Sequence, residues 1–281
     1  HMKKTIVAAA VAAVFAAPAM ADVKISGAVQ FEAGEFDSAG ASDNRVKSDI
    51  KFSGSEDLGN GMKAGYAMVM TLDDQSATSN DATDKYVSLS GDFGTIKAGN
   101  FEMYMESSIT AMAANDSAHD VSNEISDGEY TVGASGQTIQ YTSPSFNGVT
   151  VVAQTADNAD DIAIQYSGNG LLVRAGTESN VGGNDVDAFG IQYTMNGLTA
   201  KFVNVDNGSG DDKSWVGVEY AMGNNKIAYS VVDAATADGD GDSTLSLTHS
   251  LSKATSVYLV LGTDDDTSAN DETVVGIKHT F

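Results

Sequence analysis

The sequence has no cysteine among its 281 residues. This absence excludes a disulfide scaffold, a thiolate metal site and a thiol nucleophile. Proline is almost as rare, with 2 residues, and only Pro144 lies beyond the first 21 positions. Because proline interrupts the hydrogen bonds of a sheet, its scarcity beside 29 glycines is typical of long strands joined by tight turns.

Basic residues are also few. The chain carries 15 lysines and arginines against 39 acidic residues, a formal net charge of −24. Such a chain repels polyanions, so nucleic acid is not expected as a partner. The apolar fraction of 42% is ordinary, which argues against an acidic disordered protein.

The first 21 residues have the pattern of a secretory signal. Lys3 and Lys4 precede the apolar run IVAAAVAAVFAA, and Ala19-Met20-Ala21 forms an A-x-A cleavage site. The apolar run is too short and too rich in alanine to cross a bilayer of about 30 Å. We therefore expect residues 1–21 to be a cloning residue, His1, followed by a cleaved signal peptide.

From Asp22 onward, apolar and polar residues alternate with a period of two, which indicates β-strands. In the first run Val23, Ile25, Val29 and Phe31 share one face and polar residues occupy the other. Sixteen such runs are predicted, at 23–36, 44–55, 61–72, 83–90, 94–101, 137–143, 147–156, 160–167, 170–178, 186–195, 197–206, 212–222, 224–234, 242–251, 254–263 and 271–281.

The connections between these runs alternate in kind. Short turns such as SGDFG and SGNG alternate with longer acidic segments such as DDQSATSND and TDDDTSAND. Bacterial outer-membrane barrels have short periplasmic turns and longer extracellular loops in this way. A soluble β-sandwich would fit each single strand, but its strands usually have about 5–6 residues, whereas a membrane strand needs about 9–11. The sequence therefore predicts an all-β fold, with residues 22–281 forming one transmembrane, sixteen-stranded antiparallel β-barrel.

Three segments resemble the Gram-negative general porins of the neisserial and burkholderial type. They are FSGSEDLGNGMKAGYAM (52–68), YVSLSGDFGTIKAGN (86–100) and VVGIKHTF (274–281). The resemblance implies an outer-membrane homotrimer for passive diffusion of small hydrophilic solutes, with a third extracellular loop folded inward. Residues 102–136 form the longest connection without alternation and are expected to be that loop. Expected partners also include outer-membrane lipid, lipopolysaccharide and the barrel-assembly machinery, which would read the terminal Phe281.

A diffusion channel needs a constriction of suitable width and charge, and it needs no cofactor, metal or catalytic residue. The alternation directs five basic residues into the lumen: Arg45, Lys47, Lys51, Lys97 and Arg174. The inward loop would oppose them with Glu102, Glu106, Asp116, Asp120 and Glu124, followed by Asp127 and Glu129. Each basic residue could equally be a solvated side chain away from the narrowest ring, and the acids could lie on an external loop. Because acids concentrate cations, we expect a weak cation preference.

Three other functions are compatible with a barrel of this kind: a hydrolase, a substrate-specific channel and an adhesin. A barrel hydrolase would need a Ser-His pair, but no G-x-S-x-G motif accompanies His119, and His249 and His279 are predicted to face lipid near the periplasmic rim. A substrate-specific channel would be expected to show an aromatic track, and an adhesin long external loops; neither is evident. The aromatic residues are predicted to form interfacial girdles or trimer contacts: Phe31, Tyr66, Tyr166, Tyr193, Phe202, Trp215, Tyr220, Tyr229 and Tyr258.

Overall fold

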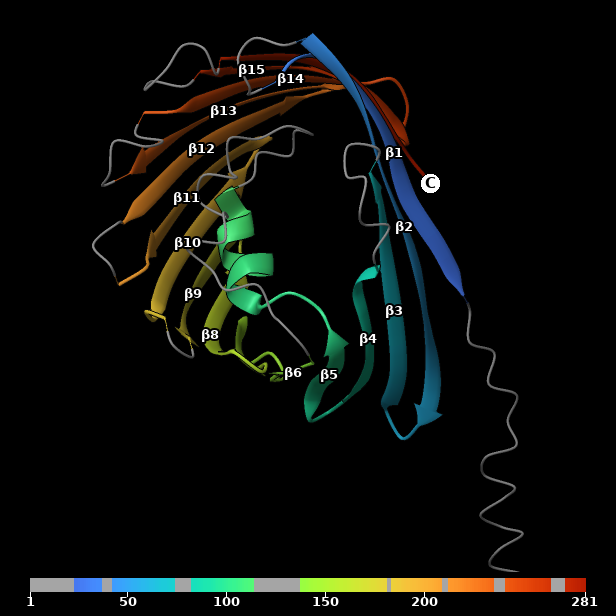
Figure 1. The fold of residues 1–281 in the computed structure, drawn as a ribbon. Coiled ribbons are helices and arrows are strands. Elements are labelled where there is room, and N and C mark those ends of the chain that lie inside the picture. Colours follow the sequence, from blue (N-terminus) through green and yellow to red (C-terminus); the bar gives the residue numbers. More distant parts are fainter. Residues whose placement is uncertain are drawn as a thin grey trace, which may run out of the picture.

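The computed structural model describes residues 23–36, 42–73, 82–113, 137–180, 183–208, 212–234, 241–263 and 271–281. Within these residues, sixteen strands form one closed barrel in which every pair of neighbours is antiparallel (Figure 1). The expected signal segment, residues 1–21, lies outside the described residues.

The strands follow one another around the barrel in chain order. They are β1 (Lys24–Glu35), β2 (Ser42–Gly59), β3 (Met62–Asp73), β4 (Ala82–Gly91), β5 (Gly94–Asn100), β6 (Thr138–Thr142), β7 (Val149–Thr155), β8 (Ala159–Gly168), β9 (Leu171–Asn180), β10 (Val186–Met195), β11 (Leu198–Asp206), β12 (Lys213–Met222), β13 (Asn225–Ala234), β14 (Ser243–Ser250), β15 (Thr255–Thr263) and β16 (Glu272–Thr280). Each predicted run coincides with one strand, and β2 departs most from its predicted ends. The predicted barrel is confirmed.

Several of the short connections are built on Asn-Gly pairs. In four of them the asparagine has φ of 51–52° and the following glycine also has positive φ. Two successive positive φ values are characteristic of the type I′ turn, whose backbone twist matches the right-handed twist of the two strands that it joins. The pairs are Asn60-Gly61, Asn147-Gly148, Asn169-Gly170 and Asn196-Gly197.

The barrel closes where the first strand meets the last. β1 pairs with β16 from Ala28 opposite Thr280 to Glu35 opposite Thr273. The seam continues to the last residue, because Phe281 exchanges two backbone hydrogen bonds of 3.0 Å with Gly27. No unpaired strand edge is left at this seam, as an open sheet would have.

The two faces of the wall differ as the alternation predicts. On β1, Val29 and Phe31 are exposed, whereas Gln30 and Glu32 are buried. On β8, Ile162 and Ile164 are exposed, whereas Asp161 and Ala163 face inward and are buried. An apolar outer face suits hydrocarbon, and strands satisfy their backbone polar groups within the closed wall. None of the helices in the described ranges is long and apolar enough to cross a membrane.

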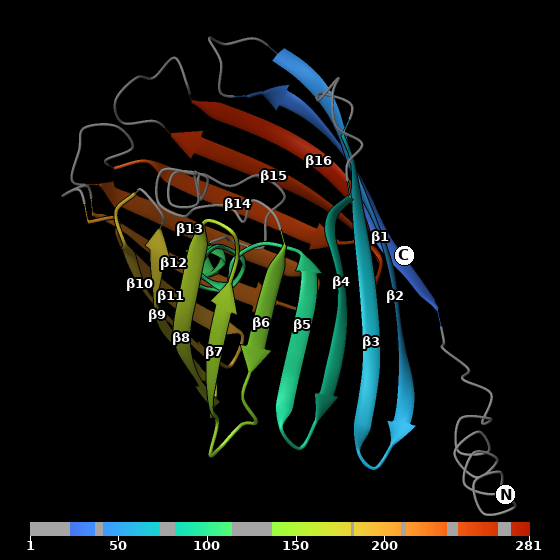
Figure 2. The ribbon, with the colours of Figure 1, turned by 60° about the horizontal axis from the view of Figure 1, so that its bottom comes forward.

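A short helical segment follows β5 and lies inside the barrel. It consists of the π-helix η1 (Met105–Ile109) and the 3-10 helix η2 (Thr110–Ala113). Both views place it against the inner side of the wall, where it contacts β9, β10, β11 and β12 (Figures 1 and 2). We call residues 101–113 the inner segment.

The inner segment packs onto the wall through an apolar cluster. Met105, Ile109 and Met112 meet Val203 and Trp215 there, and all five are buried. Along this side the inner face of the barrel is therefore apolar. The girdle prediction is wrong for Trp215 and for Tyr258, because both are buried on the inner face. Trp215 lies two residues after Lys213, which faces inward, so the alternation of the strand also turns Trp215 inward. The girdle prediction relied on the residue type and overlooked this position.

Candidate functional site

The basic residues of β2 lie on the inner wall beside a buried carboxylate. Arg45 Nε donates a hydrogen bond of 2.6 Å to Oε2 of Glu32, which has no exposed side-chain surface. Lys47 Nζ is 3.9 Å from the same oxygen. The Arg45 guanidinium also lies 3.8 Å above the ring of Phe36, a cation–π contact. Arg45 is thus a paired charge, whereas Lys47 keeps 39% of its side chain exposed.

Lys97 of β5 is placed over two aromatic rings. Its Nζ lies 3.6 Å from the ring centre of Phe101 and 4.8 Å from that of Tyr86. The charges that act on it are those of Asp84, Lys51 and Glu102. Two of the predicted basic residues, Lys51 and Lys97, therefore share one electrostatic neighbourhood with a predicted loop acid.

Glu102 and Glu106 belong to the inner segment and are partly withdrawn from water. Burial raises the pKa of Glu102, the charge of Asp84 raises it further, and Lys97 opposes both effects. Burial likewise raises the pKa of Glu106, and the charge of Glu102 adds to the effect. Each carboxyl therefore takes up a proton more readily than an exposed glutamate.

Arg174 of β9 contacts the inner segment directly. Its Nη1 donates to the backbone oxygen of Ser108 at 2.6 Å, and its Nε donates to Oε1 of Gln165 at 2.7 Å. Tyr104 donates to the same Gln165 oxygen at 3.3 Å. These contacts hold the helical turn against β8 and β9.

Other wall side chains bind the backbone of the segment. Asp161 Oδ2 accepts from the Met105 N–H at 3.0 Å, and Gln154 Nε2 donates to the Glu102 carbonyl oxygen at 3.0 Å. Thr138 donates to the Phe101 carbonyl oxygen at 3.4 Å. Strands β6 to β9 thus secure both the entry to the segment and its first turn.

Part of the predicted acidic ring lies outside the described residues. This applies to Asp116, Asp120, Glu124, Asp127 and Glu129. Among the predicted residues that the structure does describe, Lys51, Lys97, Glu102 and Glu106 are brought together, while Arg45 and Arg174 are held by specific partners.

Sequence reasoning missed several charged residues of the inner wall. Glu32 and Asp84 were omitted although the alternation in β1 and β4 gives them inward parity. Lys278 lines a hollow of about 280 Å³ with Gln30, Lys47, Asp49 and Thr71. Glu219 of β12 forms ion pairs with Lys201 and Lys226. Strand parity, applied to every charge rather than to selected basic ones, is the signal that would have found them.

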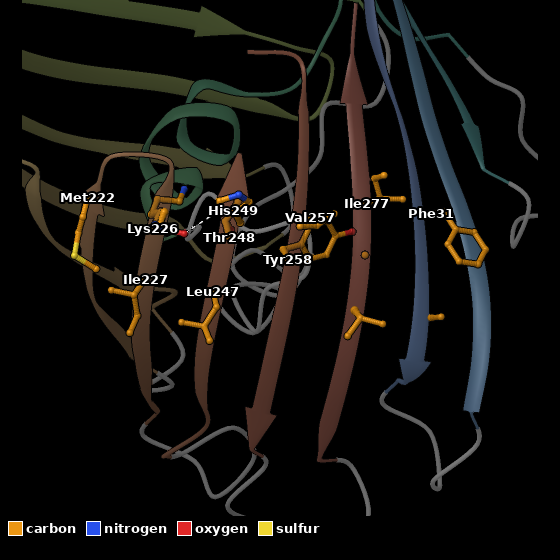
Figure 3. A pocket seen from close by; sticks show the side chains of 14 residues that line it. Phe31, Met222, Lys226, Ile227, Leu247, Thr248, His249, Val257, Tyr258 and Ile277 are labelled. Carbon is orange, nitrogen blue, oxygen red and sulfur yellow. Dashed lines mark hydrogen bonds between the residues drawn. The ribbon is translucent and has the colours of Figure 1, made fainter. Parts of the chain in front are cut away.

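The two described histidines lie on the outer wall. His249 lines an apolar hollow of about 680 Å³ together with Ile227 and Leu247. Figure 3 shows the side chains that line this hollow. His249 Nδ1 is 2.8 Å from Asn225 Oδ1, and His279 Nδ1 is 2.9 Å from Thr255 Oγ1. His119 lies outside the described residues. In the ranges that the structure describes, no three His, Cys, Asp or Glu side chains are grouped to hold a metal ion.

Comparison with known proteins finds a family model and curated relatives that match this chain. A family model described as "Gram-negative porin" matches residues 8–269. The major outer membrane protein P.IB of Neisseria lactamica is 27% identical over 199 residues, which is 62% of this chain and 58% of that protein. A monosaccharide porin of a Halomonas species is 32% identical over 93 residues, 31% of this chain and 25% of that protein. The chain thus spans less than two thirds of the length of these curated relatives.

Solved structures of porins have the same fold as this chain. A mutant of the Rh. blastica porin has a TM-score of 0.72 at 18% identity, covering 92% of this chain and 100% of that one. The OmpF of Salmonella typhi, in a complex with daunomycin, has a TM-score of 0.72 at 15% identity, covering 92% and 97%. Since the family model spans most of the chain and the closed barrel is the same, the chain belongs to the Gram-negative porin family and is an outer-membrane β-barrel.

Proposed function

We propose that the protein is a general diffusion channel through which small hydrophilic solutes and ions cross the outer membrane passively. The observation that carries this proposal is the closed barrel with an apolar outer face and charged residues on its inner wall and inner segment. Such an arrangement selects by width and charge and needs no catalytic group. We therefore propose a transport function without enzymatic activity.

The selective part of the channel is proposed to lie between the inner segment and the wall of β2, β4 and β5. Glu102 and Glu106 are the acids of the inner segment, and Lys51 and Lys97 are the bases of the wall, of which Lys97 interacts with Glu102. Opposite charges across a passage create a transverse field that orients dipolar solutes, and the acids raise the local concentration of cations. A weak cation preference is therefore proposed, to which Asp116, Asp120 and Glu124 would add.

The proposed assembly is a homotrimer in the outer membrane, in contact with lipid and lipopolysaccharide. Family resemblance supports the trimer, and the apolar outer face supports contact with lipid. The barrel-assembly machinery is proposed to read the C-terminal strand that ends at Phe281. Supporting this, the last residue belongs to the seam that closes the barrel.

A second candidate is a channel with a preference for sugars. One relative is named a monosaccharide porin, and the inner hollow offers the polar side chains of Gln30, Asp49 and Thr71. Sugar hydroxyl groups could bond to such side chains. This candidate predicts that millimolar glucose interrupts the single-channel current.

The test is electrical recording from the purified protein in a planar bilayer with a KCl gradient. The wild type is expected to conduct in steps of three and to show a weakly cation-selective reversal potential. Glu102→Gln and Glu106→Gln should shift this potential toward anions, and Lys51→Gln should shift it toward cations. Lys253→Gln, which changes an exposed turn residue, is the control. Stable insertion without conductance would overturn the proposed channel.

A further inference from the structure

A buried carboxylate lies behind the basic residues at the closing seam of the barrel. The Glu32 side chain has no exposed surface. Its Oε1 accepts from Gln30 Nε2 at 2.7 Å and from the Tyr258 hydroxyl at 2.9 Å. Its Oε2 accepts from Arg45 Nε at 2.6 Å and lies 3.9 Å from Lys47 Nζ. Donors from three strands therefore surround one carboxylate.

The barrel register brings these partners together. Glu32 is directly opposite Arg45, and Gln30 is directly opposite Lys47. On the other side Glu32 faces Gly276, which in turn faces Tyr258. Because Gly276 has no side chain, the Tyr258 ring lies across β16 and its hydroxyl reaches Glu32, 226 residues away in sequence.

The contacts also determine which charges reach the lumen. Arg45 and Lys47 keep 19% and 39% of their side chains exposed, whereas Glu32 is covered by them. A buried carboxylate is tolerated only when hydrogen bonds and opposite charges compensate it, and here both are present. The negative charge in turn cancels one of the two positive charges that solutes would meet on this part of the wall.

We propose that Glu32 is a charge-setting residue of the channel: it neutralises and orients Arg45 and so limits the attraction of this wall for anions. The inference rests on the proposed diffusion function and deepens it by naming a determinant of ion selectivity. Glu32 acts through Arg45 and Lys47, which makes it a positioning residue. A purely structural role at the seam would affect stability and leave the selectivity of the folded channel unchanged.

The charge of Glu32 can be removed with little change of shape by Glu32→Gln. With the charge of Arg45 no longer neutralised, the ratio of cation to anion permeability should fall by about twofold or more. Glu32→Asp keeps the charge and should stay close to wild type. The double variant Glu32→Gln with Arg45→Gln removes one charge of each sign and should return the reversal potential toward the wild-type value.

The matched control is Glu35→Gln, which makes the same charge change at an exposed position at the end of the same strand. It should shift the reversal potential much less than Glu32→Gln. Folding of each variant is checked by the resistance of the barrel to unfolding in detergent gels.

Four outcomes decide the matter. An anion shift in Glu32→Gln that the double variant reverses supports the inference. A folded, conducting Glu32→Gln channel with the wild-type reversal potential overturns it while the proposed channel function stands. If Glu32→Gln fails to fold, Arg45→Gln alone must shift the potential toward cations, and an unchanged potential overturns the inference. Wild-type protein that inserts without conducting overturns the channel function itself, and the inference with it.

Discussion

Trp215 offers the sharpest test of how the inner segment is held in place. Its indole is fully buried on the inner side of β12, in contact with the cluster formed by Met105, Ile109 and Met112. An apolar residue on the outer face gains little by packing, because lipid is itself apolar. Trp215 faces the lumen side, where water is the alternative environment, so its burial is stabilised by the hydrophobic effect.

Trp215→Ala should therefore weaken the attachment of the segment. Truncating a buried tryptophan to alanine typically costs about 3–5 kcal/mol. Since 1.4 kcal/mol corresponds to a factor of ten, the ratio of attached to detached segment should fall by about 100- to 4,000-fold. A detached segment would move away from the inner wall into the open part of the lumen, so single-channel recordings should show brief partial closures that the wild type lacks.

Two controls isolate the cause. Trp215→Phe keeps most of the apolar volume, and the indole Nε1 has no hydrogen-bond partner in the described structure, so this variant should behave almost as wild type. Val216→Ala truncates the next residue, which is exposed on the outer face, and should leave the current unchanged. Trp215→Ala channels with wild-type current noise and thermal stability would refute the reasoning.

Three further predictions concern the same inner surface. Because the pKa values of Glu102 and Glu106 are raised, the proposed cation preference should be complete above these values and should be lost as pH falls through them, beginning above the ordinary glutamate value of about 4.3. A reversal potential that stays constant from pH 7 to pH 4 would contradict this prediction. The same shifts stabilise the folded state most below the ordinary glutamate pKa, and this contribution is lost as pH rises through the raised values. Arg174→Gln removes the charged donor to the Ser108 carbonyl oxygen and should lower the free energy of unfolding by about 1.5–3 kcal/mol, measured by thermal denaturation in detergent, with Lys253→Gln as the unaffected control. Gly276→Ala places a methyl group where the Tyr258 ring lies and should separate Tyr258 from Glu32; an unchanged melting temperature would argue against this contact.

Much of the fold was readable from the sequence because strand alternation is a local property. Successive side chains point to opposite faces whatever the rest of the chain does, so the sixteen runs, the apolar outer face and the inward direction of Lys51 and Lys97 could be predicted. The Asn-Gly turns are equally local, since two adjacent residues supply the positive φ values that a tight hairpin needs.

The partners of the inward residues were decided only by the tertiary structure. Parity places Glu32 and Arg45 on the inner face, but the register of β1 against β2 and the closure of β1 on β16 set the contact between Glu32, Arg45 and Tyr258. The apolar cluster around Trp215 likewise depends on a segment more than one hundred positions earlier in the chain folding back across the barrel. Alternation determines which side a residue faces, whereas register, closure and curvature determine what it meets there, and those are properties of the whole barrel.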